Sequence, residues 1–361
     1  MRSRIDLYLL RDAINQLTET TYFTKRLHEF TANIVEVIDY VLTNEATIAP
    51  DIVNKFRGIM HQTYVYLAGS TTKEAPYEME YCLQKALARW VARGTIITTA
   101  LTSHHDFHFA PADPWDFVKR YLPGFNTAGY DPLLVQLGLP RLYRHKPVYC
   151  LALYHELGHF VDESFGITNL SLVLEPSMIA TNHLGLPATV SPRLRNTIES
   201  NHRKEYFCDL FGAAYAGKAS IDAVVTIAPG AGASQTHPAT ADREASVAAF
   251  LNGNPTQLIT LFQQCLKQQG KPDLAKFFKL PDLKPKYDDL RPYKVPDEEE
   301  LHGVLGASWS YLLDALDRRA APWISSGMLD SQIESITNDL TEKTLRNASI
   351  RERWASHGAA P

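Results

Sequence analysis

The stretch His155-Glu156-Leu157-Gly158-His159 contains most of a catalytic metal site. On an α-helix, residues four positions apart lie on one face, so both imidazoles can point towards one metal ion. Glu156 lies about 100° round the helix from His155, from where its carboxylate can reach a water bound to that ion. The pattern H-E-x-x-H therefore predicts a metal hydrolase, with His155 and His159 as ligands and Glu156 as the general base.

The residues around this motif predict a buried helix. A segment that is apolar on almost every side lies in a protein interior, where His and Glu side chains need partners. We expect Pro147 to open the helix and Gly166 to close it. A pair of hydrogen-bonded core histidines is the alternative interpretation of the motif. The apolar residues of the segment are Val148, Cys150, Leu151, Ala152, Leu153, Leu157, Phe160 and Val161.

A catalytic zinc ion needs a third protein ligand and an open position for water. No histidine occurs in the twenty residues that follow His159, so the third ligand must come from farther along the chain. The candidates are Glu163, Glu175, Glu199 and Glu205.

The segment E-Y-F-C-D-L-F-G-A-A at positions 205–214 favours Glu205 as this ligand. As a helix, the segment places Glu205 and Asp209 on one face and its aromatic and aliphatic side chains on the opposite face. Asp209 can then accept a hydrogen bond from a ligand imidazole, which fixes the tautomer and orientation of that ring. An ordinary amphipathic helix with two exposed acids is the alternative interpretation.

These two segments resemble the gluzincin zinc peptidases, most closely the M48 family, in which an H-E-x-x-H helix is followed by a distant E-x-x-x-D helix. Thr236-His237-Pro238, with Arg243 a few residues later, is similar to a further element of that family. The resemblance covers about residues 148–245. A similar helix pair occurs in the ImmA/IrrE-like regulatory peptidases.

The resemblance implies a mainly α (α+β) fold with a zincin-like peptidase core, in which the two helices pack together beside a small β-sheet. It implies that His237 faces the cleft and helps to stabilise the transition state, whereas the alternative is a turn histidine beside a proline. It also implies that Asp209 and Arg243 support the site. The implied ligands of the Zn²⁺ ion are His155, His159 and Glu205.

Hydrophobic periodicity and the positions of prolines divide the chain into four regions. We expect a helical region over residues 1–100, the peptidase core over 101–270, a linker rich in proline and charge over 271–300, and a helical region over 301–361. The helices expected outside the core cover residues 5–17, 30–41, 51–67, 78–91, 301–316 and 333–345.

Several connections can be predicted within these regions. Ser191 and Pro192 predict the start of a long helix that ends near Gly217. The stretch 230–234, rich in glycine, is either a hinge that moves His237 or a simple turn. Residues 184–190 are expected to shape a substrate pocket, and residues 351–361 are expected to be loose.

Residues 101–146 combine histidines, prolines and glycines, and they predict a long, irregular connection. His104, His105, Asp106 and His108 lie close together within it. A second metal site is one interpretation of this group, but its spacing fits no defined site, so a polar loop is favoured.

The composition narrows the classes of protein to which the chain can belong. With 45% hydrophobic and 21% charged residues, it is typical of a globular protein, and a net charge of -4 gives no indication of nucleic-acid binding. The sequence contains no apolar run long enough for a membrane span and no signal-peptide core. Four widely spaced cysteines without a C-x-x-C pair fit a reducing, cytoplasmic location.

Together these features predict a cytoplasmic zinc metalloendopeptidase, a hydrolase that acts on a protein or peptide substrate. One alternative is a regulatory protease that cleaves a single repressor, toxin or antitoxin and recognises this partner through its helical flanks. A second alternative is a non-catalytic binding module in which zinc staples two helices. Glu156 argues against this second alternative, because a structural zinc site has no use for a base at that position.

Overall fold

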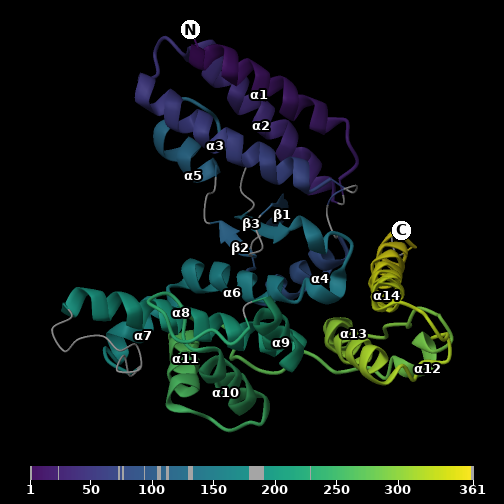
Figure 1. Ribbon diagram of the computed structural model, residues 1–361. Coiled ribbons are helices and arrows are strands. Elements are labelled where there is room, and N and C mark those ends of the chain that lie inside the picture. The colour runs from purple at the N-terminus through teal and green to yellow at the C-terminus, as the bar shows by residue number, and fades with distance from the viewer. Residues whose placement is uncertain are drawn as a thin grey trace. The chain divides into compact units, whose positions relative to one another are not determined.

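The computed structural model describes residues 2–22, 24–71, 74, 77–92, 94–103, 107–110, 114–128, 133–178, 191–227 and 229–358. These residues form mostly α-helices and one three-stranded sheet, which confirms the prediction of a mainly helical protein (Figure 1). The chain divides into two compact units, Met1–Glu80 with Val91–Arg144 and Tyr81–Trp90 with His145–Pro361. No helix in the described part combines the length and apolar character that a membrane crossing requires.

The first unit contains helices and the sheet. Strand β3 lies in the middle of the sheet, parallel to β1, with Val135 opposite Ile97, and antiparallel to β2, with Leu137 opposite Phe109. The elements of this unit are α1 (Arg2–Thr18), α2 (Lys25–Asn44), α3 (Pro50–Gly69), β1 (Thr95–Thr102), β2 (His108–Ala110), α5 (Pro114–Tyr121), β3 (Leu133–Pro140) and the 3-10 turn η1 (Arg141–Tyr143).

Helix α3 ends directly against β1. A Cβ atom on Gly69 would lie 2.4 Å from the carbonyl oxygen of Thr99, so only glycine allows the two backbones to come this close. The hydroxyl of Ser70 then accepts a hydrogen bond of 2.8 Å from the Thr99 amide. These contacts fix the end of the helix on the sheet.

The prediction of an irregular connection over residues 101–146 is wrong, because β2, α5 and β3 lie there. Strand β1 ends in the same stretch, and its residues Ile96–Ala100 are all buried. A strand that is buried on both faces does not show the alternation of apolar and polar residues by which strands are usually recognised.

The histidine group of this stretch is described only at His108. Its ring packs over Gly138, and its Nε2 lies 3.2 Å from the hydroxyl of Tyr66, so His108 is a packed residue of the sheet. His104, His105 and Asp106 lie outside the described residues.

The second unit is helical in its described part. Its elements are α4 (Tyr77–Ala88) from Tyr81 onwards, the 3-10 turn η2 (Pro147–Tyr149), α6 (Ala152–Phe165), α7 (Ile167–Leu174), α8 (Pro192–Ala216), α9 (Lys218–Ile227), α10 (Thr240–Leu251), α11 (Gln257–Gln268), α12 (Lys284–Tyr287), α13 (Glu298–Arg318) and α14 (Asp330–Gly358).

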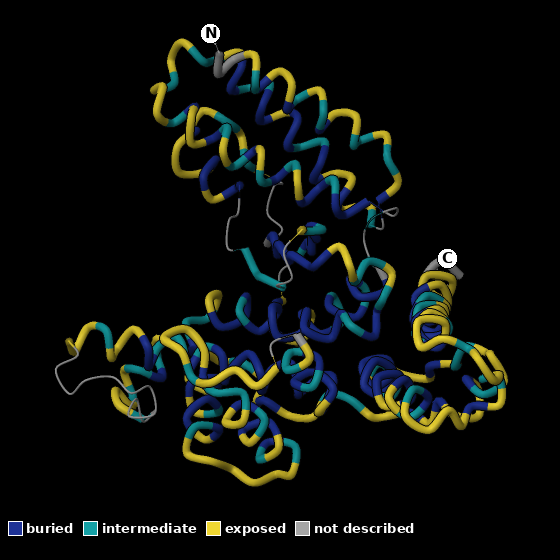
Figure 2. The backbone as a smooth tube through the Cα atoms, viewed as in Figure 1, coloured by how far each residue is buried: buried dark blue, intermediate teal, exposed yellow. Residues whose placement is uncertain are grey.

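Helices α6 and α8 carry the predicted metal ligands. Gly166 closes α6 in the left-handed conformation, as predicted, whereas Pro147 opens the separate turn η2 and α6 begins only at Ala152. Ser191 caps α8, and Gly217 follows its last residue, which confirms both predicted ends. Every residue of α8 from 205 to 216 is buried, so the helix runs through the core of the unit (Figure 2).

The C-terminal part is more regular than predicted. Asp297 caps α13, and three glutamates follow in its first turn, where negative charge is favourable. Helix α14 continues to Gly358, so the prediction of a loose segment over residues 351–361 is wrong for residues 351–358. Residues 271–297 are irregular apart from α12, and α13 begins at Glu298. The backbone amide of Phe277 donates to the Ala214 carbonyl at 2.7 Å.

A buried ion pair on α8 fixes the chain that follows α7. Arg203 is fully buried and donates to Glu199 at 2.7 Å, to Ser171 at 3.2 Å and to the carbonyl of Glu175. Glu199 in turn accepts a hydrogen bond of 3.1 Å from the backbone amide of Met178. This pair therefore holds the segment that leaves α7.

We predict that Arg203→Met will lower the free energy of unfolding by about 3–5 kcal/mol, because it leaves the Glu199 carboxylate buried without its ion-pair partner. Arg193→Met is the matched control, since Arg193 is exposed on the same helix, and its effect should stay within about 0.5 kcal/mol. Chemical denaturation measures both values. Equal effects of the two substitutions would contradict a stabilising role for this buried pair.

Candidate metal centre

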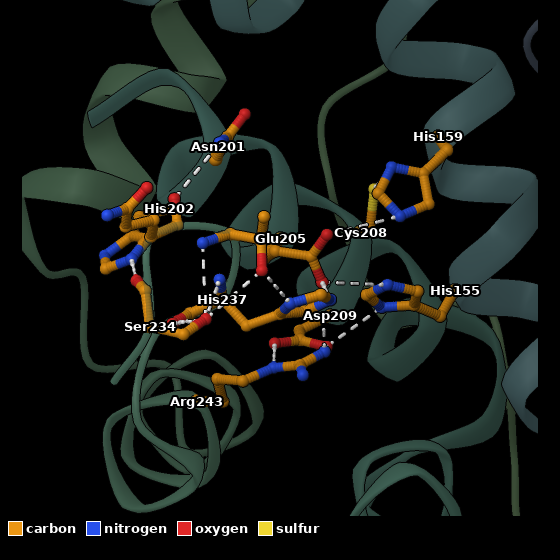
Figure 3. A network of polar contacts seen from close by, with 12 residues as sticks. His155, His159, Asn201, His202, Glu205, Cys208, Asp209, Ser234, His237 and Arg243 are labelled. Carbon is orange, nitrogen blue, oxygen red and sulfur yellow. Dashed lines mark hydrogen bonds and ion pairs between the residues drawn. The ribbon is translucent and has the colours of Figure 1, made fainter. Parts of the chain in front are cut away.

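The candidate centre forms where α6 and α8 come closest. A Cβ atom on Gly158 would lie 2.9 Å from the Cα of Cys208, so the glycine inside the H-E-x-x-H motif is required for this approach. Gly212 on α8 is less critical, because its Cβ would lie 3.5 Å from the backbone nitrogen of His155, an ordinary contact. The packing brings the histidine face of α6 against the carboxylate face of α8 (Figure 3).

Glu205 reaches both histidines of the motif. Its carboxylate oxygens lie 3.3 Å from Nε2 of His155 and 3.5 Å from Nε2 of His159. The rings of His155 and His159 stand nearly perpendicular, with their centroids 4.9 Å apart. All three side chains are largely buried, so the group is an internal polar cluster and not two exposed acids on an amphipathic helix.

Asp209 and Arg243 support this cluster from the side away from His159. Nδ1 of His155 donates to Asp209 at 2.9 Å, which is the contact expected between Asp209 and a ligand imidazole. Arg243 of α10 donates to both carboxylate oxygens of Asp209 at 2.7 Å. It also lies 3.4 Å from Glu205. A bidentate pair of this kind fixes the carboxylate and, through it, the ring of His155.

The charged side chains of the cluster shift one another's pKa values. Burial alone would lower the pKa of His155, but hydrogen bonds to Asp209 and Glu205 raise it to about 10. Burial and the neighbouring charge of His155 lower the pKa of His159 to about 3. Burial would raise the pKa of Glu205, but the contacts with His155 lower it to about 2. At neutral pH, His155 is therefore cationic, His159 is neutral and Glu205 is ionised.

Cys208 provides a further donor atom beside the histidines. Its Sγ lies 3.2 Å from Nδ1 of His159, on the other nitrogen from the one that faces Glu205. Donor atoms of His155, His159 and Cys208 lie within 4.8 Å of one another, so this buried group could hold a metal ion. Burial raises the pKa of the Cys208 thiol well above its ordinary value, which keeps it protonated.

His237 lies at the solvent side of the cluster. Its Nε2 is 3.6 Å from Glu205, and its side chain is 55% exposed, whereas that of Glu205 is 10% exposed. Glu156 lies on α6 next to His155 and is 8% exposed. The structure thus brings His237 to the same cluster as the predicted ligands.

Two residues of α8 that the sequence pattern did not single out hold the loop residues that precede His237. Asn201 donates to the carbonyl of Gln235 at 3.1 Å, and Nε2 of His202 donates to the carbonyl of Ser234 at 2.7 Å. His202 precedes Glu205 by three positions, so it shares a face of α8 with that residue. The spacing of His202 and Glu205 is the signal that could have indicated a role for His202 at the centre. It does not identify the carbonyl of Ser234 as the partner of His202.

The other candidates for a third ligand lie in different surroundings. Glu163 and Glu175 are exposed, and Glu199 pairs with Arg203. Two tyrosines on the same helices could also donate to a substrate. Tyr154 contacts Nδ1 of His302 in the core at 2.8 Å. Burial raises the pKa of Tyr206 to about 12. The predicted pocket segment 184–190 lies outside the described residues.

Comparisons of the chain with protein-family models, with curated proteins and with solved structures find no match. The function of the centre must therefore be inferred from its own geometry. All four cysteines lie among the described residues, are buried and form no disulfide bond.

Proposed function

We propose that this protein is a zinc-dependent metallopeptidase that hydrolyses peptide bonds of a protein or peptide substrate, with His155, His159 and Glu205 as zinc ligands. The observation that carries this proposal is the position of Glu205, whose two carboxylate oxygens face the Nε2 atoms of both motif histidines. An ordinary core ion pair would need only one of these histidines.

The separation of Glu205 from each histidine is close to that between two ligands of a tetrahedral ion. Ligand atoms about 2.0–2.1 Å from a tetrahedral zinc ion lie about 3.3–3.4 Å from one another. Oε2 of Glu205 lies 3.3 Å from Nε2 of His155, and Oε1 lies 3.5 Å from Nε2 of His159. Two nitrogens and one carboxylate oxygen are also a donor set found in catalytic zinc sites, and such sites keep one position open.

Glu205 is a better third ligand than Cys208 on grounds of charge. Ligation requires the deprotonated form of either side chain. The low pKa of Glu205 supplies the carboxylate at neutral pH, whereas the raised pKa of Cys208 means that a second proton, besides that of His155, would have to leave on binding. Cys208 also contacts His159 through Nδ1, which is the nitrogen directed away from Glu205.

The residues of the chain then have distinct tasks in hydrolysis. When bound, zinc would supply an activated water and polarise the substrate carbonyl. Glu156 accepts a proton from the attacking water and passes it to the leaving amine. His237 donates a hydrogen bond to the oxygen on which negative charge develops. Asp209, held by Arg243, keeps Nε2 of His155 directed at Glu205 and the metal.

The proposal is tested with a peptide library made from a digested cell proteome. The zinc-loaded protein is incubated with the library, and new peptide ends are identified by mass spectrometry. New ends that disappear when zinc is removed by chelation are the expected result. Intact peptides together with a single cleaved partner in a whole-protein lysate would instead support the regulatory protease, and intact material in both samples would oppose the peptidase.

We predict that zinc affinity will rise about tenfold per pH unit between about pH 6 and about pH 8. The raised pKa of His155 means that one proton must leave when metal binds, whereas His159 and Glu205 have already lost theirs. Lower pH therefore weakens binding. Competition titrations with a chelator of known affinity measure the slope, and a slope of two would show that His159 is protonated as well.

Asp209→Asn is the control for this pH dependence. It removes the hydrogen-bonded charge that raises the pKa of His155, so the pKa should fall towards its ordinary value of about 6.5. The slope should then flatten above about pH 7.

We further infer a cytoplasmic location, which is supported by four cysteines that form no disulfide bond.

A further inference from the structure

The loop that carries His237 is a closed, hydrogen-bonded turn. The amide of Thr240 donates to the carbonyl of Ala231 at 3.0 Å, and the amide of Ser234 donates to the carbonyl of His237 at 2.8 Å. Two side chains from α8 also bind carbonyls at its tip. Of the two interpretations of the glycine-rich stretch, these contacts favour a turn that presents His237 at one position.

The hydroxyl of Ser234 has a defined direction within this turn. Its oxygen accepts hydrogen bonds from the amides of Thr236 at 3.2 Å and His237 at 3.0 Å. A hydroxyl oxygen has two lone pairs, so both are occupied, and its hydrogen must be donated. The nearest acceptor is the hydroxyl oxygen of Thr236 at 3.2 Å, and the carbonyl of His237 is farther away at 3.4 Å.

This arrangement favours one direction for the next hydrogen bond. The Thr236 hydroxyl oxygen accepts from Ser234 and lies 2.9 Å from Nδ1 of His237. Its own hydrogen is then available for Nδ1. An imidazole nitrogen that accepts a hydrogen bond carries no hydrogen, so in the neutral ring the hydrogen lies on Nε2.

We propose that Ser234 and Thr236 are positioning residues that hold neutral His237 as the tautomer with its hydrogen on Nε2, directed at the metal centre. This hydrogen-bond arrangement belongs to the turn itself, whereas its consequence for catalysis rests on the proposed peptidase function. Thr236 thus has a task in the T-H-P element that is separate from the backbone turn.

The resulting N–H group is free to bind a substrate oxygen. Nε2 of His237 lies 3.6 Å from Glu205, which is too long for a hydrogen bond. The ring is also half exposed, so a peptide at the centre can reach it. A donor that is already oriented before the reaction stabilises developing negative charge without a further rearrangement.

The tautomer can be measured directly by nuclear magnetic resonance on the full chain labelled with ¹⁵N-histidine. Protonated and unprotonated ring nitrogens have well separated ¹⁵N shifts, and loss of one set of signals in His237→Gln assigns the ring. For the wild type, at a pH where His237 is neutral, we expect an unprotonated Nδ1 and a protonated Nε2. A protonated Nδ1 would overturn the proposal.

Two substitutions of Thr236 test the source of this preference. Thr236→Val keeps the shape but removes the hydroxyl, and the tautomer ratio should shift roughly fivefold towards that of free histidine, as expected for one net hydrogen bond. Thr236→Ser restores the hydroxyl and should restore the wild-type ratio. Thr236 is exposed, so neither of its substitutions should affect folding. An unchanged ratio in Thr236→Val would overturn the proposal.

These measurements are independent of the proposed peptidase function. The ¹⁵N shifts report the tautomer even if no peptide is cleaved, so a failed cleavage assay leaves the result for Thr236 intact. Zinc affinity provides the second check, because His237 is not among the proposed ligands. It should change less than twofold in Thr236→Val, and a larger loss would show that Thr236 acts on the ligands and not on His237 alone.

Discussion

Glu156→Gln should reduce peptide cleavage by about 10²–10⁴-fold, the usual contribution of a general base, while zinc binding stays close to that of the wild type. Glutamine has nearly the shape of glutamate but accepts no proton. Glu156 is not one of the proposed ligands, so the metal should remain. The cleavage rate of one library peptide and the zinc content of the same sample, measured by elemental mass spectrometry, are the two readouts.

Glu163→Gln is the matched control, because Glu163 is an exposed carboxylate on the same helix. This substitution should change neither readout. Equal cleavage by wild type and Glu156→Gln would show that Glu156 is not the base. Loss of zinc from Glu156→Gln would show that its carboxylate takes part in holding the metal.

The helices of the centre could be predicted because their signals are local. H-E-x-x-H places two imidazoles on one face whatever surrounds them, and Ser191 and Gly166 mark helix ends through their own backbone and side-chain chemistry. The position of Asp209 one turn after Glu205 predicted a hydrogen bond to a ligand imidazole, and the structure shows that this imidazole is His155. The peptidase activity and the zincin-like core stay predictions.

The features that were missed depend on contacts between distant parts of the chain. Gly158 reads as an unremarkable helix residue, and its importance comes only from the Cα of Cys208 on another helix. Cys208 itself reads as a small apolar residue, yet its sulfur contacts His159. Strand β1 lacks the alternating pattern, and its residues Ile96–Ala100 are all buried. Such partners are set by packing, which no short pattern encodes.

Glu205→Ala should lower zinc affinity by roughly two to three orders of magnitude, since about 10–16 kcal/mol of binding energy is shared among four ligands in comparable sites. Cys208→Ala should lower it by about tenfold or less, the effect of losing a group that only orients a ligand. Competition titrations measure both affinities. A comparison of the two variants shows which of the two side chains that face His159, Glu205 or Cys208, contributes more to zinc binding.

The cobalt-substituted protein gives an independent answer to the same question. A thiolate bound to Co²⁺ produces a charge-transfer band in the near ultraviolet, and we expect none in the wild type, because Glu205 is the proposed ligand. A band that is lost in Cys208→Ala would instead make Cys208 a ligand. With His155, His159 and Glu205 it would then complete four protein ligands, which is typical of a structural site with no open position for water. That outcome would support the binding module stapled by zinc, and it would give Glu156 no proton to accept.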